Sequence, residues 1–383
     1  MRYPTNKTYD SNIHNWNKTD AFLTGDNVEA YLLKGVYEKD GRFKKRVQLT
    51  DFQPITRQII SRLSGMVSNT QNIEITGTDI LPDDFLNTAG QNDESFRVMM
   101  KRLSSILFSF NDGGVVVHPG PRPRISIHKP QLIPRWIDSR VVVVESMRKL
   151  QATIKEPESS ETVYVIYKPD SWEMVKVKKE GSENVITTID KNDYDHTFII
   201  NGVEVSPAMR VTFGFSTAIG VELAKTHEAI YRMESAVDAG TYEAIVSSTI
   251  QAAVGSNEEL AKEFVKALKE KQGYLPYSKD VGEHKPLALP TGPLDIGINT
   301  IERKKKAMMK ALGGVMDEIS NRSATEANIR SKSGLESTLS IAASNMESIE
   351  ENILRRVAQA SNTSLTQSQL EQITVTYPLD FMD

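Results

Sequence analysis

The feature that most constrains the fold is a change of hydrophobic period along the chain. Between residues 114 and 215, short runs such as VVVH, RISIH and TVYVIYK alternate apolar and polar residues or carry β-branched residues. A period of two is typical of strands, because successive side chains point to opposite faces of a sheet. Turn residues separate the runs, among them Glu180-Gly181 and Asn201-Gly202, and the latter pair suits a tight type I′ hairpin. We therefore predict an antiparallel β-rich domain over this range.

Helical periodicity precedes these strands. From Asp51 the apolar residues Ile55, Ile59 and Leu63 recur on one helical face, and a second helix runs from about Phe96 to Phe110. Asp93 is placed to cap this second helix. Residues 1–20 are rich in Asn, Thr, Asp and Lys, offer little to bury, and are predicted to form a loosely held arm.

Helical periodicity returns after residue 218 and continues almost to the end of the chain. We predict a long helix over 219–246, a small α/β insert over 247–296, a helix over 298–312 ended by Gly313-Gly314, and a last helix over 324–360. Within the insert, Ile250 to Val254 reads as a strand, and a helix opens at Asn257. The predicted fold class is α+β, and 383 residues allow two or three cores.

The last predicted helix has an apolar stripe whose steps of four and three are close to a heptad seam. A helix of this length, roughly 50 Å, rarely buries itself within one small domain. The stripe must therefore meet neighbours, either elsewhere in the chain or in a second subunit, and we assign it to inter-subunit contact. It comprises Leu335, Leu339, Ala342, Met346, Ile349 and Ile353.

Composition excludes several function classes. There are no cysteines, so disulfides, thiolate metal sites and cysteine nucleophiles are absent. The net charge of −4 gives no global attraction to nucleic acid or to an anionic membrane. The polar start MRYPTNKTYDSN lacks the apolar core of a signal peptide, and the longest aliphatic run, Val141 to Val144, is far too short for a membrane helix. We expect a soluble protein made in a reducing compartment.

The search for catalytic motifs is negative. The sequence contains no Walker A phosphate loop, no GxGxxG dinucleotide loop and no GxSxG elbow. His227-Glu228 begins like a zinc-protease helix, but Tyr231 occupies the position of the second histidine, which favours a surface histidine on a helix. We therefore expect no enzyme activity, no cofactor and no metal.

An acidic cluster resembles the start of a calcium loop. It comprises Asp190, Asn192, Asp193 and Asp195, followed by His196. An EF-hand loop needs Gly at its sixth position and Glu at its twelfth, and here those positions are Asp195 and Asn201. A solvated turn between strands is the favoured interpretation.

One charged segment stands out: Arg303, Lys304, Lys305, Lys306 and Lys310 crowd the helix predicted over 298–312. Because consecutive helical residues lie about 100° apart, Ile301, Met308 and Leu312, with the stem of Lys305, define a packed face. The triplet Arg303, Lys306 and Lys310 shares another face. It is either a solvated surface or a contact for a phosphate backbone, and it is our best candidate for DNA-facing residues.

The order of these parts resembles that of the portal protein of tailed bacteriophages, from about residue 50 onward. Four stretches carry the resemblance: ITRQIISRLSGMVSNTQNIEI, IHKPQLIPRWIDSRVVVVESM, ELAKTHEAIYRMESAVDAGTYEAIVSSTIQAAVG and SATEANIRSKSGLESTLSIAASNMESIEENILRRVAQ. The last is the most telling, because small residues followed by an alternation of small and apolar residues are typical of the portal wing helix.

The resemblance implies a division of the chain: 1–50, an arm and first wing elements; 51–218, a wing domain; 219–246, a stem helix; 247–296, a clip; 297–312, a second stem helix; 313–324, a tunnel loop; and 325–383, a long wing helix with a C-terminal strand and a reduced or absent crown. The tunnel-loop residues would be Gly313, Gly314, Val315, Met316, Asp317, Glu318, Ile319, Ser320, Asn321 and Arg322.

The resemblance also implies partners. Portal subunits form a homo-oligomeric ring, usually a dodecamer, at one capsid vertex, through which double-stranded DNA passes without sequence preference. The expected partners are the terminase large subunit, a head-tail adaptor, and the major capsid or scaffolding protein, but no membrane. The expected location is the virion, assembled in the host bacterial cytoplasm. The alternatives are another phage structural protein, such as a minor capsid or adaptor subunit, and a nucleic-acid-binding enzyme or regulator that uses the basic helix.

Overall fold

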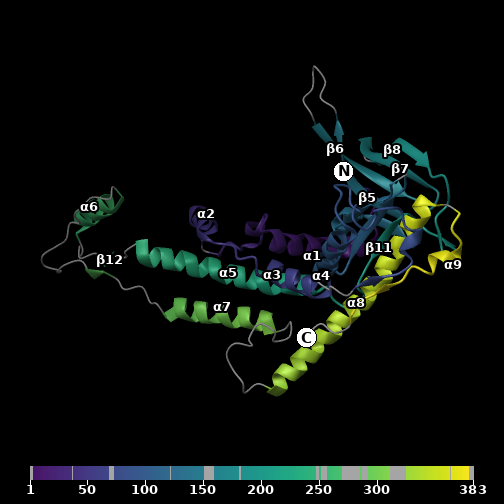
Figure 1. The fold of residues 1–383 in the computed structure, drawn as a ribbon. Helices are drawn as coiled ribbons and strands as arrows, with labels where there is room; N and C mark the ends of the chain where they lie inside the picture. Colours follow the sequence, from purple (N-terminus) through teal and green to yellow (C-terminus); the bar gives the residue numbers. More distant parts are fainter. Residues whose placement is uncertain are drawn as a thin grey trace. The chain divides into compact units, whose positions relative to one another are not determined.

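The chain has a mixed α+β fold with antiparallel sheets, as predicted. The computed structural model describes residues 3–36, 38–68, 73–120, 122–150, 159–180, 183–246, 250–251, 257–269, 285–286, 292–310, 325–362 and 364–378 (Figure 1). The chain folds into two compact units. Unit 1 comprises Met1–Asn27, Pro54–His227 and Met308–Asp383, and unit 2 comprises Val28–Gln53 and Glu228–Ala307.

The helices of unit 1 are α1 (Lys7–Thr24), α3 (Ile55–Ser68), α4 (Phe96–Phe110), α8 (Thr325–Ser361) and α9 (Gln367–Leu370). Its strands are β1 (Glu74–Ile75), β2 (Gly113–His118), β3 (Arg124–His128), β4 (Arg135–Ile137), β5 (Val141–Leu150), β6 (Ser159–Tyr167), β7 (Ser171–Glu180), β8 (Glu183–Asp193), β9 (Ile199–Ile200), β10 (Val203–Glu204), β11 (Ala208–Val211) and β14 (Val375–Thr376).

Unit 2 contains α2 (Asp40–Leu49), α6 (Glu258–Lys269), most of α7 (Gly292–Lys310) and the short strands β12 (Ile250–Gln251) and β13 (Lys285–Pro286). Helix α5 (Ile219–Val246) begins in unit 1 and continues in unit 2. Residues 28–53 therefore belong with the predicted stem and clip segments, whereas the sequence-based division grouped most of them with the wing.

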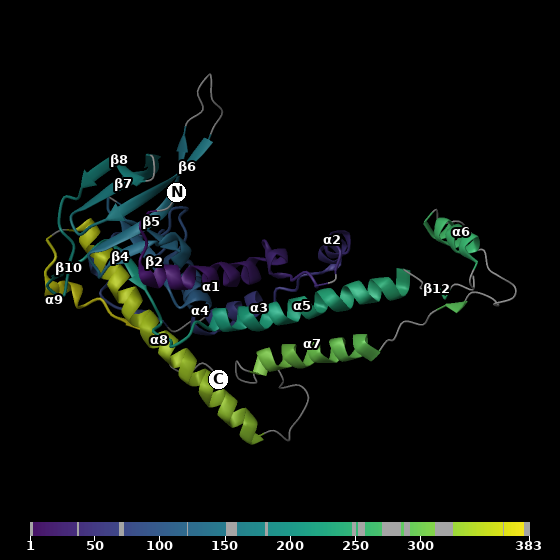
Figure 2. The ribbon, with the colours of Figure 1, turned by 180° about the vertical axis from the view of Figure 1, so that it is seen from behind.

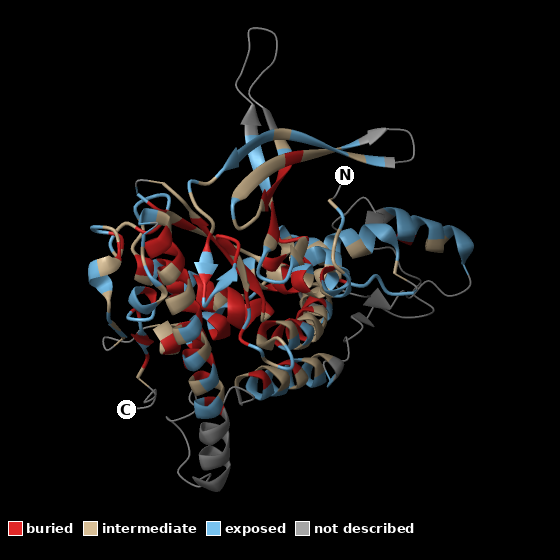
Figure 3. Ribbon diagram, turned by 90° about the vertical axis from the view of Figure 1, so that its right-hand side faces the viewer, coloured by how far each residue is buried: buried red, intermediate tan, exposed pale blue. Residues whose placement is uncertain are grey.

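The strands of unit 1 form two main sheets. A three-stranded sheet has the order β11-β2-β3, and a five-stranded meander has the order β4-β5-β6-β7-β8. Buried residues of both sheets, including Val116, Val142 and Ala208, pack together around Ile133. Figure 3 shows buried residues concentrated where helices meet the sheets, while much of the β7–β8 pair is exposed or half-buried.

The predicted hairpin at Asn201-Gly202 is confirmed. The two residues link β9 to β10 with φ angles of 53° and 74°, as a type I′ turn requires. Strands β7 and β8 also pair in antiparallel register, but residues 181–182 between them, and with them the predicted turn at Gly181, lie outside the described residues.

The prediction of a loosely held arm over residues 1–20 is wrong. Helix α1 covers most of it, and Tyr9 and Trp16 are buried against Ile106 and Phe110 of α4. The segment has few apolar residues, but they include large aromatic rings on one helical face. Two such rings bury enough apolar area to dock a helix that is otherwise polar.

Two helix starts differ from prediction. The cap of α4 is Ser95, whose side chain accepts a hydrogen bond from Val98 N, while Asp93 instead forms an ion pair with Arg124 at 2.7 Å. Helix α7 begins at Gly292, six residues before the predicted start. Pro293 fits in the first turn of this helix, because its missing N–H would have no intrahelical partner there.

In the small α/β insert, the helix predicted to open at Asn257 is confirmed. Asn257 Oδ1 accepts a hydrogen bond from Leu260 N at 3.0 Å, at the start of α6. Strands β12 and β13 pair in antiparallel register. The strand predicted over 250–254 is described only over Ile250–Gln251.

The stripe on α8 is part of the chain's own core. Leu339, Ala342, Met346 and Ile353 are completely buried, and Leu335 and Ile349 expose 6% and 7% of their surface. Helix α8 packs on α3, β2 and β14, so intramolecular contacts use the apolar seam. The structure therefore corrects the assignment of Leu335, Leu339, Met346, Ile349 and Ile353 to inter-subunit contact.

Charged residues of α8 hold the C-terminal segment. Glu350 is fully buried, receives a hydrogen bond from Tyr377 Oη, and lies 2.9 Å from Arg97 Nη1 of α4. Glu347 accepts a hydrogen bond from Tyr377 N at 2.7 Å. Strand β14 pairs with β1 beside this cluster, which confirms the predicted C-terminal strand.

Stability is expected to fall as the pH rises from about 5 to about 8, because of Glu350. Burial raises the pKa of Glu350 to about 7 from 4.5, although Arg97 and Tyr377 act in the other direction. The folded chain therefore binds this proton more tightly than the unfolded chain. The resulting stabilisation is complete below about 4.5 and is lost as the pH passes about 7.

Thermal unfolding midpoints measured across this pH range in the native chain and in Glu350→Gln test this expectation. The amide does not titrate, so the variant should lose the part of the pH dependence that Glu350 supplies. Parallel pH profiles for the two proteins would contradict the assignment.

Candidate nucleic-acid interface

The basic helix α7 is packed closely against α5 in antiparallel fashion (Figures 1 and 2). A Cβ added at Gly297 would lie 2.8 Å from Val237 Cγ2, and one at Gly240 would lie 2.7 Å from Leu294 Cδ2. The two glycines thus allow the helix backbones to approach. Helix α5 is about 42 Å long and α7 about 28 Å at 1.5 Å per residue.

The packed face of α7 is the one predicted from its spacing. Ile301 and Met308 are buried, at 6% and 3% exposure. Between them, Lys305 Nζ lies 2.8 Å from Glu234 Oε1 and 3.0 Å from Gln53 Oε1. Lys305 is therefore a structural lysine, whose charge is neutralised by a buried carboxylate of α5. The remaining predicted member, Leu312, lies outside the described residues.

The opposite face of α7 carries the candidate DNA-facing residues. Arg303 and Lys306 are exposed, and neither has an ion pair or hydrogen bond within the described part of the chain. Lys310 lies on the same helical face, one turn further along, but its side chain is outside the described set. Two charged groups of the triplet are thus free to meet a ligand, and contact with DNA stays a prediction.

Helix α2 is a second basic element, which the sequence analysis missed. Its exposed Arg42, Lys44 and Lys45 come from the run RFKKRV, and Lys45 Nζ lies 4.2 Å from the centre of the Tyr242 ring of α5. Arg46 donates to Ser235 Oγ of α5 at 2.8 Å and lies 2.9 Å from Glu38. This guanidinium lowers the pKa of Glu38 to about 2. The cluster of basic residues in one short segment was the available signal.

Helix α5 therefore contacts both basic helices, α2 and α7, through polar side chains. Ser235 accepts hydrogen bonds from Arg46 and from Thr50, which follows α2. The neighbouring Glu234 forms an ion pair with Lys305 of α7. Arg42 and Lys44 of α2 and Arg303 and Lys306 of α7 are exposed. Unit 2 as a whole is nevertheless close to neutral, with 17 Lys and Arg against 16 Asp and Glu, while the net charge of the whole chain is −4.

Neither a protein-family model nor a curated protein sequence matches this chain.

The predicted tunnel loop cannot be placed in this geometry. Residues 311–324 lie outside the described residues. This range contains all ten predicted loop residues: Gly313, Gly314, Val315, Met316, Asp317, Glu318, Ile319, Ser320, Asn321 and Arg322.

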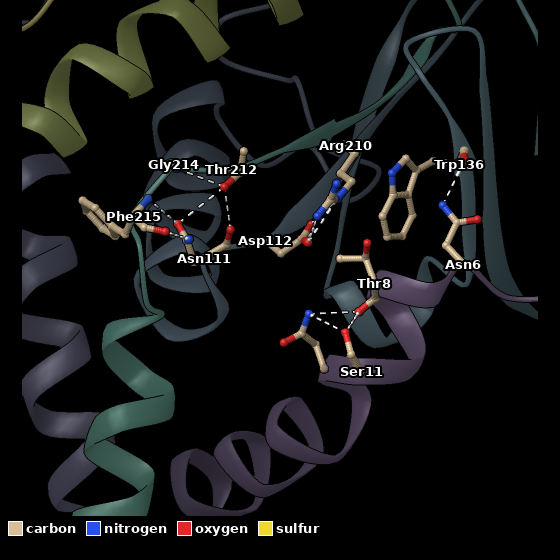
Figure 4. A network of polar contacts seen from close by, with 11 residues as sticks. Asn6, Thr8, Ser11, Asn111, Asp112, Trp136, Arg210, Thr212, Gly214 and Phe215 are labelled. Atoms are coloured by element: carbon tan, nitrogen blue, oxygen red, sulfur yellow. Dashed lines mark hydrogen bonds and ion pairs between the residues drawn. The ribbon is translucent and has the colours of Figure 1, made fainter.

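A polar network in unit 1 fixes the segment that leads into α5 (Figure 4). Asn111, in a left-handed conformation with φ 54°, donates from Nδ2 to Phe215 O at 2.7 Å and accepts from Phe215 N at 3.2 Å. Beside it, Arg210 donates to both carboxylate oxygens of Asp112 and stacks 4.0 Å from the Trp136 ring centre. These contacts anchor the chain just before the first turn of α5.

His227 is buried rather than on the surface, which corrects the sequence-based interpretation. It is fully buried on α5, its Nδ1 lies 2.9 Å from Thr56 Oγ1, and its ring packs 5.0 Å from Phe22. The position four residues after Leu223 and three before Ile230 places it on the apolar face of the helix. The ring therefore serves helix packing in unit 1.

The acidic cluster is only partly a turn. Asp190, Asn192 and Asp193 lie in β8, paired with β7, and Asp195 and His196 follow it. Within the described ranges no three His, Asp or Glu side chains are grouped to hold a metal ion. Nor does any helix in those ranges combine the length and apolar character needed to cross a bilayer.

Proposed function

We propose that this chain is a structural subunit of the portal ring of a tailed bacteriophage, through which DNA is packaged and ejected. The observation that carries the proposal is the close antiparallel pair of α5 and α7, which brackets a small α/β segment and has free cations on its outer face. In such a ring the helix pair would form the stem, and β12, α6 and β13 would belong to the clip.

The charge arrangement suits a DNA conduit. Arg303 and Lys306 are long, exposed cations about one helical turn apart, and Lys310 continues the row. Repeated around a ring, they would form stacked positive belts. Such belts hold a phosphate backbone without reading base sequence, which passage of a whole genome requires.

Partners follow from the same proposal. The clip would contact the terminase large subunit during packaging and a head-tail adaptor afterwards, and the wing would contact the major capsid or scaffolding protein. The motor ATPase would be a separate chain, since this sequence has no phosphate loop. The site of action would be the virion, after assembly in the host bacterial cytoplasm.

Ring formation is the first expected result. Heterologous contacts that close by rotation give rings without exposed ends, and twelve chains of 42.8 kDa would weigh about 514 kDa. Because the α8 stripe is internal, the contacts must use other surfaces. Light scattering across protein concentration and salt should give this mass or that of a neighbouring ring size. A protein that stays monomeric or dimeric throughout would count against the proposal.

Removing the basic triplet is expected to impair DNA packaging while leaving assembly intact. In Arg303→Gln, Lys306→Gln and Lys310→Gln combined, each subunit loses three positive charges from the face opposite its packing contacts. We expect rings of normal mass but fewer filled particles or shortened genomes. Phage yield and packaged genome length are the measurements.

A matched triple variant separates this effect from loss of charge alone. Arg140, Lys178 and Lys191 are exposed cations on or beside the five-stranded sheet, and their change to Gln removes the same charge elsewhere. This control should package normally. If the α7 triple variant also yields full-length genomes at normal titre, its three cations are only a solvated face.

A further inference from the structure

A hollow of about 690 Å³ lies in unit 1. Its walls come from the ends of β2 and β6, from β7, from the end of β8 and the segment after it, and from the last turn of α8. Five aromatic or imidazole rings line it: His118, Tyr167, Trp172, Tyr194 and His196. Its volume is in the range of small-molecule sites, about 300–1,000 Å³.

The rings are held by packing within the chain. Phe198 is completely buried and supports two of them, since its ring centre lies 5.7 Å from that of Tyr194 and 4.6 Å from that of His196. On the other side, His118 packs edge-on to Tyr167 at 6.4 Å, and its Nε2 lies 2.8 Å from Ser126 Oγ. The lining is therefore preorganised.

Two of the lining residues carry a buried polar atom that has no partner within the described residues. Tyr194 Oη and His196 Nε2 are buried and make no hydrogen bond to any residue that the structure describes. Buried polar atoms in proteins are nearly always paired, so each of these two atoms stands out as lacking a partner. Both belong to the short stretch that also supplies the two carboxylates of the hollow.

The charge of the lining is negative. Asp193 and Asp195 contribute carboxylates, and no lysine or arginine occurs among the described lining residues. Burial lowers the pKa of His118 and of His196, so both rings are neutral near pH 7. Carboxylates beside aromatic ring faces attract a cation and disfavour an anion.

We propose that this hollow binds a small organic cation, an ammonium group on a short alkyl chain. Tyr167, Trp172 and Tyr194 would supply ring faces for the ammonium, and Asp193 and Asp195 would balance its charge. Tyr194 Oη would accept a hydrogen bond from a protonated amine. This inference is independent of the proposed function, because it rests only on residues of unit 1.

An organic cation fits better than a bare metal ion. The described residues hold no group of three metal-binding side chains, and the aromatic lining would contribute nothing to the first coordination sphere of magnesium or calcium. The acidic cluster that resembled a calcium loop thus has a different use. Two of its members, Asp193 and Asp195, line a volume large enough for several carbon atoms.

Calorimetric titration of the purified full-length chain tests the proposal with three probes: choline, 1,4-diaminobutane, and 3,3-dimethylbutan-1-ol, which is the neutral carbon isostere of choline. We expect saturable binding of at least one cation. The neutral isostere should bind at least about tenfold more weakly, as expected for loss of a cation–π contact in a partly desolvated site. Choline and the diamine together distinguish a quaternary from a primary ammonium ligand.

Three variants locate the binding. Trp172→Leu should weaken binding of the preferred cation about five- to tenfold, and the pair Asp193→Asn with Asp195→Asn should do the same. Tyr194→Phe keeps the ring and removes only the hydroxyl, so it should selectively weaken the diamine. Asp190→Asn, an exposed position on β8 outside the lining, is the matched control and should bind normally.

The outcomes that overturn the proposal are distinct from these. Equal affinity for choline and its neutral isostere would make the hollow an apolar pocket that holds water at its polar atoms. Cation binding that survives both the Trp172→Leu and the double Asp→Asn changes would place the ligand elsewhere. Absence of saturable binding for both cations would leave the hollow without the function proposed for it.

Discussion

Replacing Glu350 with leucine is expected to lower the free energy of unfolding by about 3–5 kcal/mol. The change leaves Tyr377 Oη and the Arg97 guanidinium without their buried partner, and Arg97 Nη2 already lacks a hydrogen bond among the residues that the structure describes. It also weakens the attachment of the C-terminal strand β14 to α8. Denaturant unfolding at a fixed protein concentration is the measurement.

Glu336 provides the control on the same helix. Its side chain is exposed, so Glu336→Leu should change the unfolding free energy by less than about 0.5 kcal/mol. Glu350→Gln should lie between the two, because an amide keeps one acceptor but places a donor where Arg97 or Tyr377 also donates. A Glu350→Leu protein as stable as the native chain would show that the cluster does not hold the C-terminal segment.

Truncating Phe108 to alanine is expected to cost a similar amount, about 3–5 kcal/mol. Phe108 of α4 is completely buried, and its ring packs 5.0 Å from Phe213 and 6.3 Å from Phe215. These two rings belong to the segment that leads from β11 into α5. Loss of the ring therefore leaves a cavity where the chain enters the long helix.

Two further variants on α4 test whether the loss of stability comes from the cavity left by the Phe108 ring. Phe108→Leu fills most of the cavity and should cost less than half as much as the alanine change. Val98 is half exposed, so Val98→Ala should be nearly neutral. Equal destabilisation by Val98→Ala and Phe108→Ala would mean that α4 is sensitive to any change and that the aromatic cluster has no special role.

Hydrophobic period predicted the succession of elements well. The bounds of α5 agree with the predicted 219–246, and α8 differs from the predicted 324–360 by one residue at each end. The strands over 114–215 also appear where short apolar runs predicted them. In all these segments the local pattern and the tertiary packing favour the same structure.

Tertiary context explains what the sequence did not reveal. Tyr9 and Trp16 are too few to give α1 an apolar period, yet α4 offers them a surface. The α8 stripe gave no indication of whether its partner was internal, because a heptad-like seam is the same in both cases. Unpaired atoms such as Tyr194 Oη follow only from the folded arrangement of distant strands.

The sequence predicted only part of the arrangement of basic residues on α7. Helical spacing separated Arg303 and Lys306 from Ile301 and Met308, and the burial of the latter pair confirms that separation. Spacing did not reveal that Lys305 is neutralised by Glu234, nor that α2 adds cations to the same unit. Those facts depend on which helices pack on α5.

The most direct test of the portal proposal is negative-stain electron microscopy of the purified full-length protein. We predict closed rings of about twelve subunits with a central hole wide enough for duplex DNA. Rings with a neighbouring subunit number would support the same conclusion. Particles that are uniformly small and have no central opening, under conditions in which the protein is folded, would contradict it.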